Sequence, residues 1–174
     1  MNSPYAVCVD SADRLWVADL GNNRVLRFDS ITTKPSGATA DGVLGQANFT
    51  TGTAGSGNNG MDYPVGVTTS AGDSLYVTCF STHRVMRFDN ASGLGANAPA
   101  SAVLGQLDFA TVTPGTTAVK MRNPNGAWIT PDDSLWVADT GNHRVLRFNN
   151  ASTKPSGAAA DGVLGQPDFT SRRK

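Results

Sequence analysis

Leu135–Phe148 reads LWVADTGNHRVLRF, and this stretch decides the fold because two further copies of it occur in the chain. The copies are LWVADLGNNRVLRF at Leu15–Phe28 and LYVTCFSTHRVMRF at Leu75–Phe88. Neighbouring copies are sixty residues apart, as Phe28, Phe88 and Phe148 show. A fixed period of this length is typical of proteins built from one repeated supersecondary unit.

Each repeat contains four short runs of apolar residues separated by turn-forming residues. In the third repeat the runs are Gly126–Ile129, Leu135–Ala138, Arg144–Phe148 and Gly162–Gln166. Runs of strand length that are rich in β-branched and aromatic residues indicate strands joined by hairpins. Four antiparallel strands make one propeller blade. We therefore predict an all-β propeller segment with three blades, at residues 4–63, 64–123 and 124–174, within one domain covering residues 1–174.

The connections between strands divide into two sets, which we expect on opposite faces. The loops between third and fourth strands, such as Asp29–Asp41, should share a face with the first turns, such as Asp10–Arg14. The turns between second and third strands should share the other face with the inter-blade links Thr50–Tyr63 and Ala110–Asn123.

The composition fits a turn-rich globular chain. Hydrophobic residues make up 39% and charged residues 16%, with 19 Gly and 9 Pro. All 14 acidic residues are Asp, which favours turns and caps, whereas the helix former Glu is missing from the sequence. The 14 basic residues balance the acidic ones, so we do not expect nucleic acid as a partner.

The sequence leaves the cellular compartment open. Cys8 and Cys79 lie at non-equivalent places in their repeats and lack CxxC spacing, so we expect free buried thiols. The first residues are not typical of a signal peptide. No apolar run approaches the ~18 residues of a membrane span, so we do not expect a membrane partner.

The third copy carries a pattern that resembles the NHL-repeat family. The matching residues are Pro124, Gly126, Trp136, Val137, Ala138, Asp139, Gly141, Asn142, His143, Arg144, Val145 and Phe148. The first copy departs from the pattern at Ala6 and Asn23. The second departs most, with Ser70 and Cys79 in place of Asp and Phe80–Thr82 in place of the Gly-Asn turn. The resemblance implies a β-propeller, usually of six blades, so that three blades make half of a ring.

Three blades in an open arc leave the outer face of the first and of the third blade uncovered. Large exposed apolar patches are rare on monomers. Two chains related by a twofold axis would close a six-bladed ring by setting first blades against third blades. We therefore predict that the chain's partner is a second copy of itself. The alternative is a piece of a longer propeller.

Charged residues recur in register with the strands. We predict inter-strand ion pairs of Asp19 with Arg24 and of Asp139 with Arg144, because a partly buried charge needs a partner. The second copy lacks this Asp, so Arg84 should find another partner or solvent. The alternative is a ring of arginines that binds an anion or an RNA phosphate.

The turns between second and third strands are the predicted ligand-binding region, because they surround one mouth of the channel. The residues concerned are Asn22, Asn23, Ser81, Thr82, His83, Asn142 and His143. His83 and His143 occupy the same position in their turns, and turn capping is the simplest interpretation. A metal ligand or general base is the alternative.

The sequence favours a non-catalytic scaffold that binds a protein or small ligand, and it leaves open whether the protein is an enzyme. We identify no catalytic residue, no metal site and no cofactor. The resemblance also extends to lyase and lactonase propellers, so the alternative is an enzyme with a divalent cation in the central channel. The innermost first strands offer Cys8, Asp10, Thr68 and Thr69, which do not form a convergent ligand set.

Overall fold

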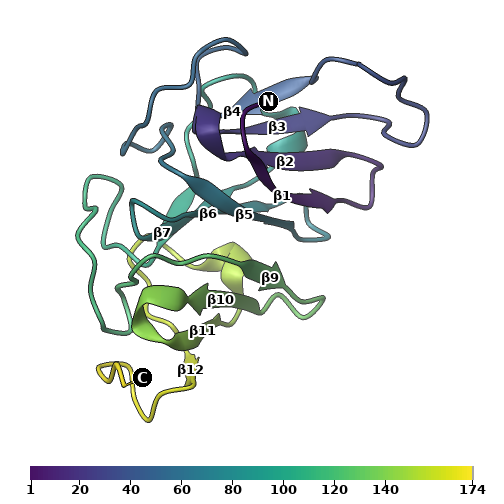
Figure 1. Cartoon of the computed structure of the whole chain (residues 1–174). Coiled ribbons are helices and arrows are strands. Elements are labelled where there is room, and N and C mark those ends of the chain that lie inside the picture. The colour runs from purple at the N-terminus through teal and green to yellow at the C-terminus, as the bar shows by residue number, and fades with distance from the viewer. Residues whose placement is uncertain (174) are drawn as a thin grey trace.

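The computed structural model describes residues 1–173, which form three four-stranded antiparallel sheets. Within each sheet the strands follow one another in chain order: β1-β2-β3-β4, β5-β6-β7-β8 and β9-β10-β11-β12. The sheets succeed each other along the chain as propeller blades do (Figure 1). The prediction of an all-β propeller with three four-stranded blades is therefore confirmed.

The strands have the lengths expected from the apolar runs. Blade 1 contains β1 (Pro4–Val9), β2 (Leu15–Asp19), β3 (Arg24–Phe28) and β4 (Gly42–Leu44). Blade 2 contains β5 (Pro64–Thr69), β6 (Leu75–Cys79), β7 (Arg84–Phe88) and β8 (Ala102–Leu104). Blade 3 contains β9 (Ala127–Ile129), β10 (Leu135–Asp139), β11 (Arg144–Phe148) and β12 (Gly162–Leu164).

The repeated stretch forms the central hairpin of every blade. In blade 3, Leu135 is paired with Phe148 and Asp139 with Arg144. The expected Gly-Asn turn is a 3-10 turn, η1 (Leu20–Asn22) in blade 1 and η3 (Thr140–Asn142) in blade 3. The next residue has a positive φ, 52° at Asn23, 57° at His83 and 54° at His143. Asn and His tolerate this left-handed conformation better than most residues, which explains their place in the turn.

The first strand of the third blade begins later than predicted. The run was expected from Gly126, but β9 begins at Ala127, and Pro124 precedes the strand. Ala138 bonds two residues there, since its carbonyl accepts from Asn125 N and its N–H donates to Gly126 O, both at 2.9 Å. Two residues opposite one is the pattern of a β-bulge, which interrupts the regular ladder.

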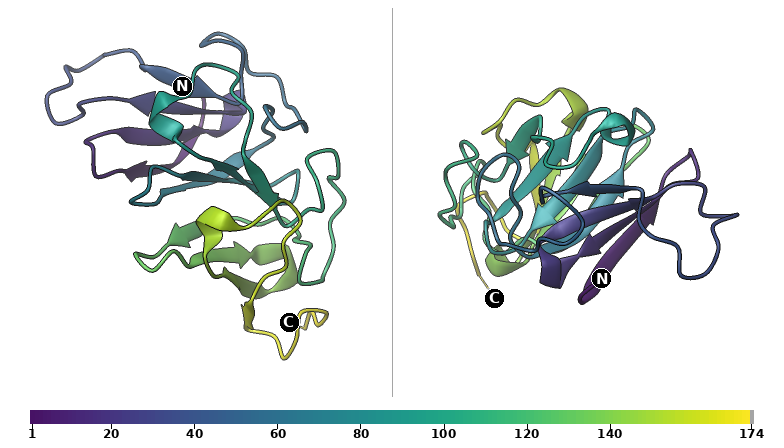
Figure 2. Two further views of the ribbon diagram at one scale, coloured as in Figure 1. Left: turned by 180° about the vertical axis from the view of Figure 1, so that it is seen from behind. Right: turned by 90° about the horizontal axis from the view of Figure 1, so that it is seen from above.

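The first strands lie side by side at the inner edge of the arc. β1 contacts β5, and β5 contacts β9. Figure 2 shows the same succession of blades from behind and from above. Two further 3-10 turns, η2 (Ala91–Gly93) and η4 (Ala151–Thr153), lie in the loops between third and fourth strands. No helix within residues 1–173 is long and apolar enough to cross a membrane.

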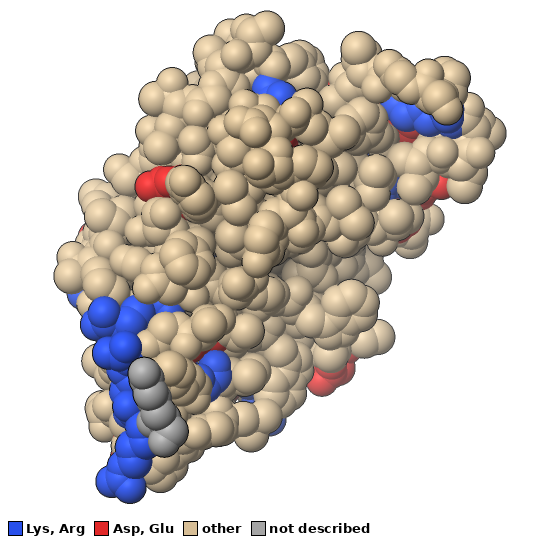
Figure 3. All heavy atoms as spheres, in the orientation of Figure 1, with Lys and Arg blue, Asp and Glu red and all other residues tan. Residues whose placement is uncertain are grey.

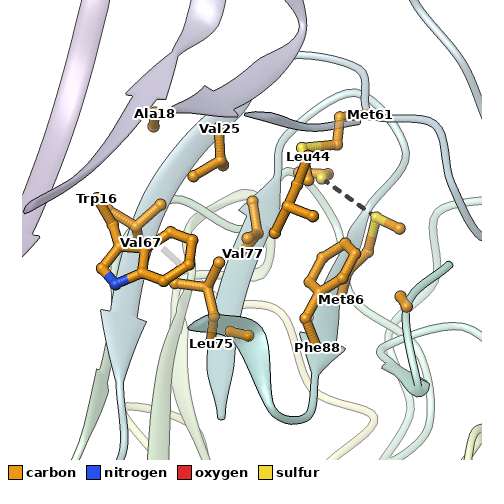
Figure 4. Packing of buried hydrophobic residues seen from close by; sticks show 13 residues of the cluster. Trp16, Ala18, Val25, Leu44, Met61, Val67, Leu75, Val77, Met86 and Phe88 are labelled. Atoms are coloured by element: carbon orange, nitrogen blue, oxygen red, sulfur yellow. Dashed lines mark hydrogen bonds between the residues drawn. The ribbon is translucent and has the colours of Figure 1, made fainter. Parts of the chain in front are cut away.

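The hydrophobic core lies between blades. Trp16 and Leu44 of blade 1 belong to one buried cluster with Val77 and Phe88 of blade 2 (Figure 4). A second cluster joins blades 2 and 3 through the corresponding residues one repeat later, including Tyr76, Leu104, Val137 and Phe148. Each blade therefore presents one apolar face to the blade before it and another to the blade after it.

The two end faces of the arc lack such a neighbour among the described residues. On blade 1, the face that would meet a preceding blade holds a buried cluster of Val17, Leu26 and Val43 and leaves Val7 62% and Phe49 46% exposed. On blade 3, the face that would meet a following blade leaves Trp128 65% and Leu164 56% exposed. These faces have the same character as those that are buried between blades.

Candidate functional site

The loops fall on two faces, as predicted. On the first face, the loop between third and fourth strands bonds the first turn, for example through Ile31 N to Asp13 O at 3.1 Å. On the second face, the Asn23 side chain donates to Gly52 O and accepts from Tyr63 N, both at 3.0 Å. We call these the first-turn face and the linker face.

The two Asp–Arg pairs form across the central hairpins. Arg24 Nε donates to Asp19 Oδ2 at 2.7 Å, and Arg144 Nε donates to Asp139 Oδ2 at 2.7 Å. Both carboxylates are fully buried. Because each guanidinium also donates to backbone carbonyls, including Phe49 O for Arg24, these arginines fasten the linkers to the blades.

Arg84 occupies the corresponding place in blade 2 without a carboxylate. It is fully buried and donates to four carbonyl oxygens, those of Ser56, Gly57, Gly60 and Phe109. Its Nε has no hydrogen-bond partner within the described chain. The expectation that Arg84 finds another partner is met by the backbone of the two linkers.

The predicted asparagines take part in structural hydrogen bonds. Asn22 donates to Asp19 Oδ2 at 2.9 Å, and Asn142 donates to Asp139 Oδ2 at 2.8 Å. Asn142 is buried and also bonds Gly115 O, whereas Asn23 holds the first linker. These amide groups stabilise the linker face.

The two histidines differ in their surroundings. His83 is half-buried, and its Nδ1 accepts from Asn123 N at 3.1 Å. Burial, and then the nearby Arg122 guanidinium, lowers the pKa of His83. His143 is exposed. They lie on different blades, and residues 1–173 contain no group of three His, Cys, Asp or Glu side chains placed to hold a metal ion.

Ser81 and Thr82 line a hollow of about 250 Å³ on the linker face. Its other walls come from the two linkers, at Ala54–Ser56 and Val112, and from Asp62. Thr82 Oγ1 is buried and has no hydrogen-bond partner among the described residues. Of the seven predicted ligand-binding residues, these two therefore line a cavity, while His143 projects to solvent.

A further polar cluster was missed in the sequence. On the first-turn face, Arg14 Nε bonds Asp10 Oδ2 at 2.7 Å, and Arg14 Nη2 bonds Asp73 Oδ1 of the next blade at 2.9 Å. Trp16 Nε1 also donates to Asp10 Oδ2, at 2.9 Å. The signal was disagreement between the copies, since Arg14 aligns with Ser74 and Ser134.

The comparisons with known proteins agree with this architecture. The family model described as NHL repeat matches residues 1–28 and 121–148. The chain therefore contains NHL repeats in blades 1 and 3. No curated protein sequence matches this chain significantly.

Solved propeller structures are similar in fold. Hydrazine synthase of Kuenenia stuttgartiensis aligns at TM-score 0.61 and 14% identity, over 99% of this chain and 38% of that chain. Virginiamycin B lyase from Staphylococcus aureus, with quinupristin, aligns at 0.57 and 12%, over 96% and 42%. The nidogen/laminin complex aligns at 0.56 and 15%, over 98% and 50%. The present chain thus spans half or less of these chains, and at such identities the likeness concerns the fold.

Proposed function

We propose that the chain is a non-catalytic interaction scaffold. In this proposal two copies close a six-bladed ring, and the ring binds a protein or small ligand on the linker face. The observation that carries the proposal is the pair of open apolar faces at the ends of the arc.

The open faces match each other repeat by repeat. Trp136, Ala138 and Val145 line an apolar hollow on blade 3. They align with Trp16, Ala18 and Val25, which are buried against blade 2. On blade 1, Val17 and Leu26 align with Val77 and Met86, which receive that packing. A first blade of one copy therefore offers the third blade of another the contacts that already join blades 1 and 2.

The Lys-Pro-Ser-Gly loops support the same arrangement. In blade 3, Gly157 N donates to Val103 O at 3.1 Å, and Ser156 Oγ accepts from Val103 N at 3.2 Å. The loop thereby bonds the outer strand of the blade before it. A β-carbon added at Gly37, the corresponding residue in blade 1, would meet no described atom within 4 Å. That loop is free to bond the outer strand of a second copy.

Light scattering tests the ring. We expect a mass twice the 18.1 kDa of one chain at micromolar concentration. A variant with Val7→Asp and Phe49→Asp places charge on the open face of blade 1, where these residues are 62% and 46% exposed, and should remain monomeric. A wild-type mass of 18.1 kDa would contradict the proposed ring.

For the ligand, the hollow beside Ser81 and Thr82 is the best-supported place. It combines a buried hydroxyl without a partner and backbone from both linkers. Small-molecule sites commonly combine such a concave wall with a few fixed polar groups. Protection of Thr82 and its neighbours from amide exchange in the presence of a ligand is the expected result, whereas protection confined to other surfaces would contradict this placement.

Nucleic acid and membranes are not part of the proposal. The side seen in Figure 3 is mostly uncharged, and its largest group of Lys and Arg forms a stripe at the lower left, with smaller groups elsewhere. The net charge of zero supplies little long-range attraction to phosphates. The lyase-like alternative requires a divalent cation in the channel, and elemental analysis of the purified ring tests it.

A further inference from the structure

The seam between blades 1 and 2 on the first-turn face is filled by an arginine. Arg14 extends from the first turn of blade 1 and joins Asp10 of its own turn to Asp73 of the next blade, at 2.7 and 2.9 Å. Asp73 also accepts from Ser92 N at 3.3 Å and from Ser92 Oγ at 2.6 Å. The guanidinium is thus one of two partners of the Asp73 carboxylate.

The seam between blades 2 and 3 repeats the acceptor but not the arginine. Asp133 accepts from Ser152 N at 3.1 Å and from Ser152 Oγ at 2.7 Å, as Asp73 does from Ser92. Ser74 stands where Arg14 would be, and Ser70 stands where Asp10 would be. The place of the missing side chain is a hollow of about 320 Å³, lined by Ser70–Gly72, Ser74, Thr130, Pro131, Asp133 and Ser152.

A buried hydroxyl beneath this seam also lacks a partner. Tyr76 aligns with Trp16, whose Nε1 donates to Asp10. Tyr76 Oη is buried and has no hydrogen-bond partner in the described part of the chain. Burial, and then the charge of nearby Asp133, raises the pKa of Tyr76, so the phenol is neutral at physiological pH and can donate or accept.

We propose that this hollow binds a guanidinium group, the side chain of an arginine on a partner peptide or protein. Asp133 keeps the acceptor geometry that Asp73 uses for Arg14, and replacement of Arg14 by Ser74 leaves room for an alkyl-guanidinium from outside. Arginine matches a carboxylate better than lysine does, because its planar fork presents several donors at once. The hydroxyls of Ser74 and Thr130 supply further acceptors.

The site does not depend on ring closure. Both walls belong to one chain, and they lie on the first-turn face, opposite the linker face of the proposed function. A monomeric chain would therefore contain the complete site, so this inference and the ring can fail separately.

The test is an NMR titration of the full ¹⁵N-labelled chain with N-acetylarginine amide. Saturable shifts are expected at the amides of Asp133 and Ser152. N-acetylcitrulline amide has the same shape without the charge, and we expect it to bind the wild-type chain roughly tenfold more weakly or worse. We expect the same loss of affinity when the arginine probe is titrated into the Asp133→Asn variant. Asp73→Asn, the matched change in the filled seam, should leave the shifts at Ser152 unchanged.

Two further variants reverse the occupancy of the seams. Ser74→Arg supplies an internal guanidinium, so the probe should no longer shift Ser152. Arg14→Ser empties the other seam, and the probe should then shift Asp73 and Ser92 as well. Equal binding of the citrulline probe, or unchanged shifts at Ser152 in both Asp133→Asn and Ser74→Arg, would overturn the proposal.

Discussion

At the scale of single residues, one buried carboxylate organises the linker end of a blade. Asp139 accepts from Arg122 N at 2.7 Å, from Asn142 at 2.8 Å and from Arg144 at 2.7 Å. Breaking a buried pair of this kind costs more than its net contribution, because the remaining charge stays buried. Blade 2 has Cys79 at this position, so Arg84 is a buried cation without a carboxylate.

We therefore expect Cys79→Asp to stabilise the chain. The new carboxylate would accept a hydrogen bond from Arg84 Nε, which has no partner among the described residues. The hydrogen bonds from the Arg84 guanidinium to backbone carbonyls, such as that of Ser56, would remain. The gain in unfolding free energy should be about 1–2 kcal/mol, measured by urea denaturation. The matched reverse change, Asp139→Cys, should cost about 3–5 kcal/mol. A Cys79→Asp chain less stable than wild type would contradict this account.

The ionisation of Asp10, on the first-turn face, should make the stability of the chain fall at acid pH. Burial opposes its ionisation, but hydrogen bonds from Trp16 and Arg14 lower the pKa of Asp10 below its usual 3.8. A carboxyl with a lower pKa in the folded state adds stability that is complete above the unfolded pKa and is lost as pH falls through the folded pKa. The stability difference between wild type and Asp10→Asn should therefore shrink from about pH 6 to about pH 2. A difference independent of pH in urea denaturation would contradict it.

At the scale of elements, contacts within a hairpin were predictable and contacts between blades were not. Asp139 and Arg144 are five residues apart on paired strands, so the period-two pattern and the short turn place them opposite each other. Arg14 and Asp73 are 59 residues apart, and their meeting depends on the angle between two blades. No local pattern contains that angle. Comparing the repeats position by position would have found the exchange of Arg14 for Ser74.

The second arginine of each third strand joins its blade to the loop of the next. Arg87 Nη1 donates to Ala151 O at 2.9 Å and to Lys154 O at 2.8 Å. Arg147 has no following blade in the described chain and lies over the Trp136 ring at 5.7 Å. The arginine of blade 2 thus joins two blades, whereas the equivalent arginine of blade 3 bonds no following blade in the described chain.

Arg87→Ala and Arg147→Ala should therefore differ. Loss of the charged donor at position 87 should lower the unfolding free energy by about 1.5–3 kcal/mol at every protein concentration. Loss at position 147 should leave the dilute chain nearly unchanged and weaken its self-association, which sedimentation equilibrium measures. Equal destabilisation of the dilute chain by both changes would show that Arg147 already has an internal partner.

At the scale of the whole molecule, the arc is a series of matching faces with two left over. Each internal seam buries an aromatic residue of the earlier blade, Trp16 at 1% exposure and Tyr76 at 0%. Trp136 holds that position in blade 3 and is only half-buried. Phe109 and Phe169 pack against the clusters of the preceding seams, whereas Phe49 of blade 1 is 46% exposed. Both ends of the arc thus leave partly exposed an aromatic residue whose counterparts are packed between blades. Contact between the first blade of one copy and the third blade of another would bury both.

Tryptophan fluorescence follows that closure directly. Trp128 and Trp136 lie on the open face of blade 3, whereas Trp16 is already buried within the chain. If two copies close the ring, dilution below the dissociation constant should expose the two blade 3 indoles and move the emission to longer wavelength. Trp16→Phe should keep this concentration dependence, and the double change Trp128→Phe with Trp136→Phe should abolish it. Emission that stays constant over a dilution in which light scattering records dissociation would place the self-association at another surface, because both indoles would then be equally exposed in the free and the associated chain.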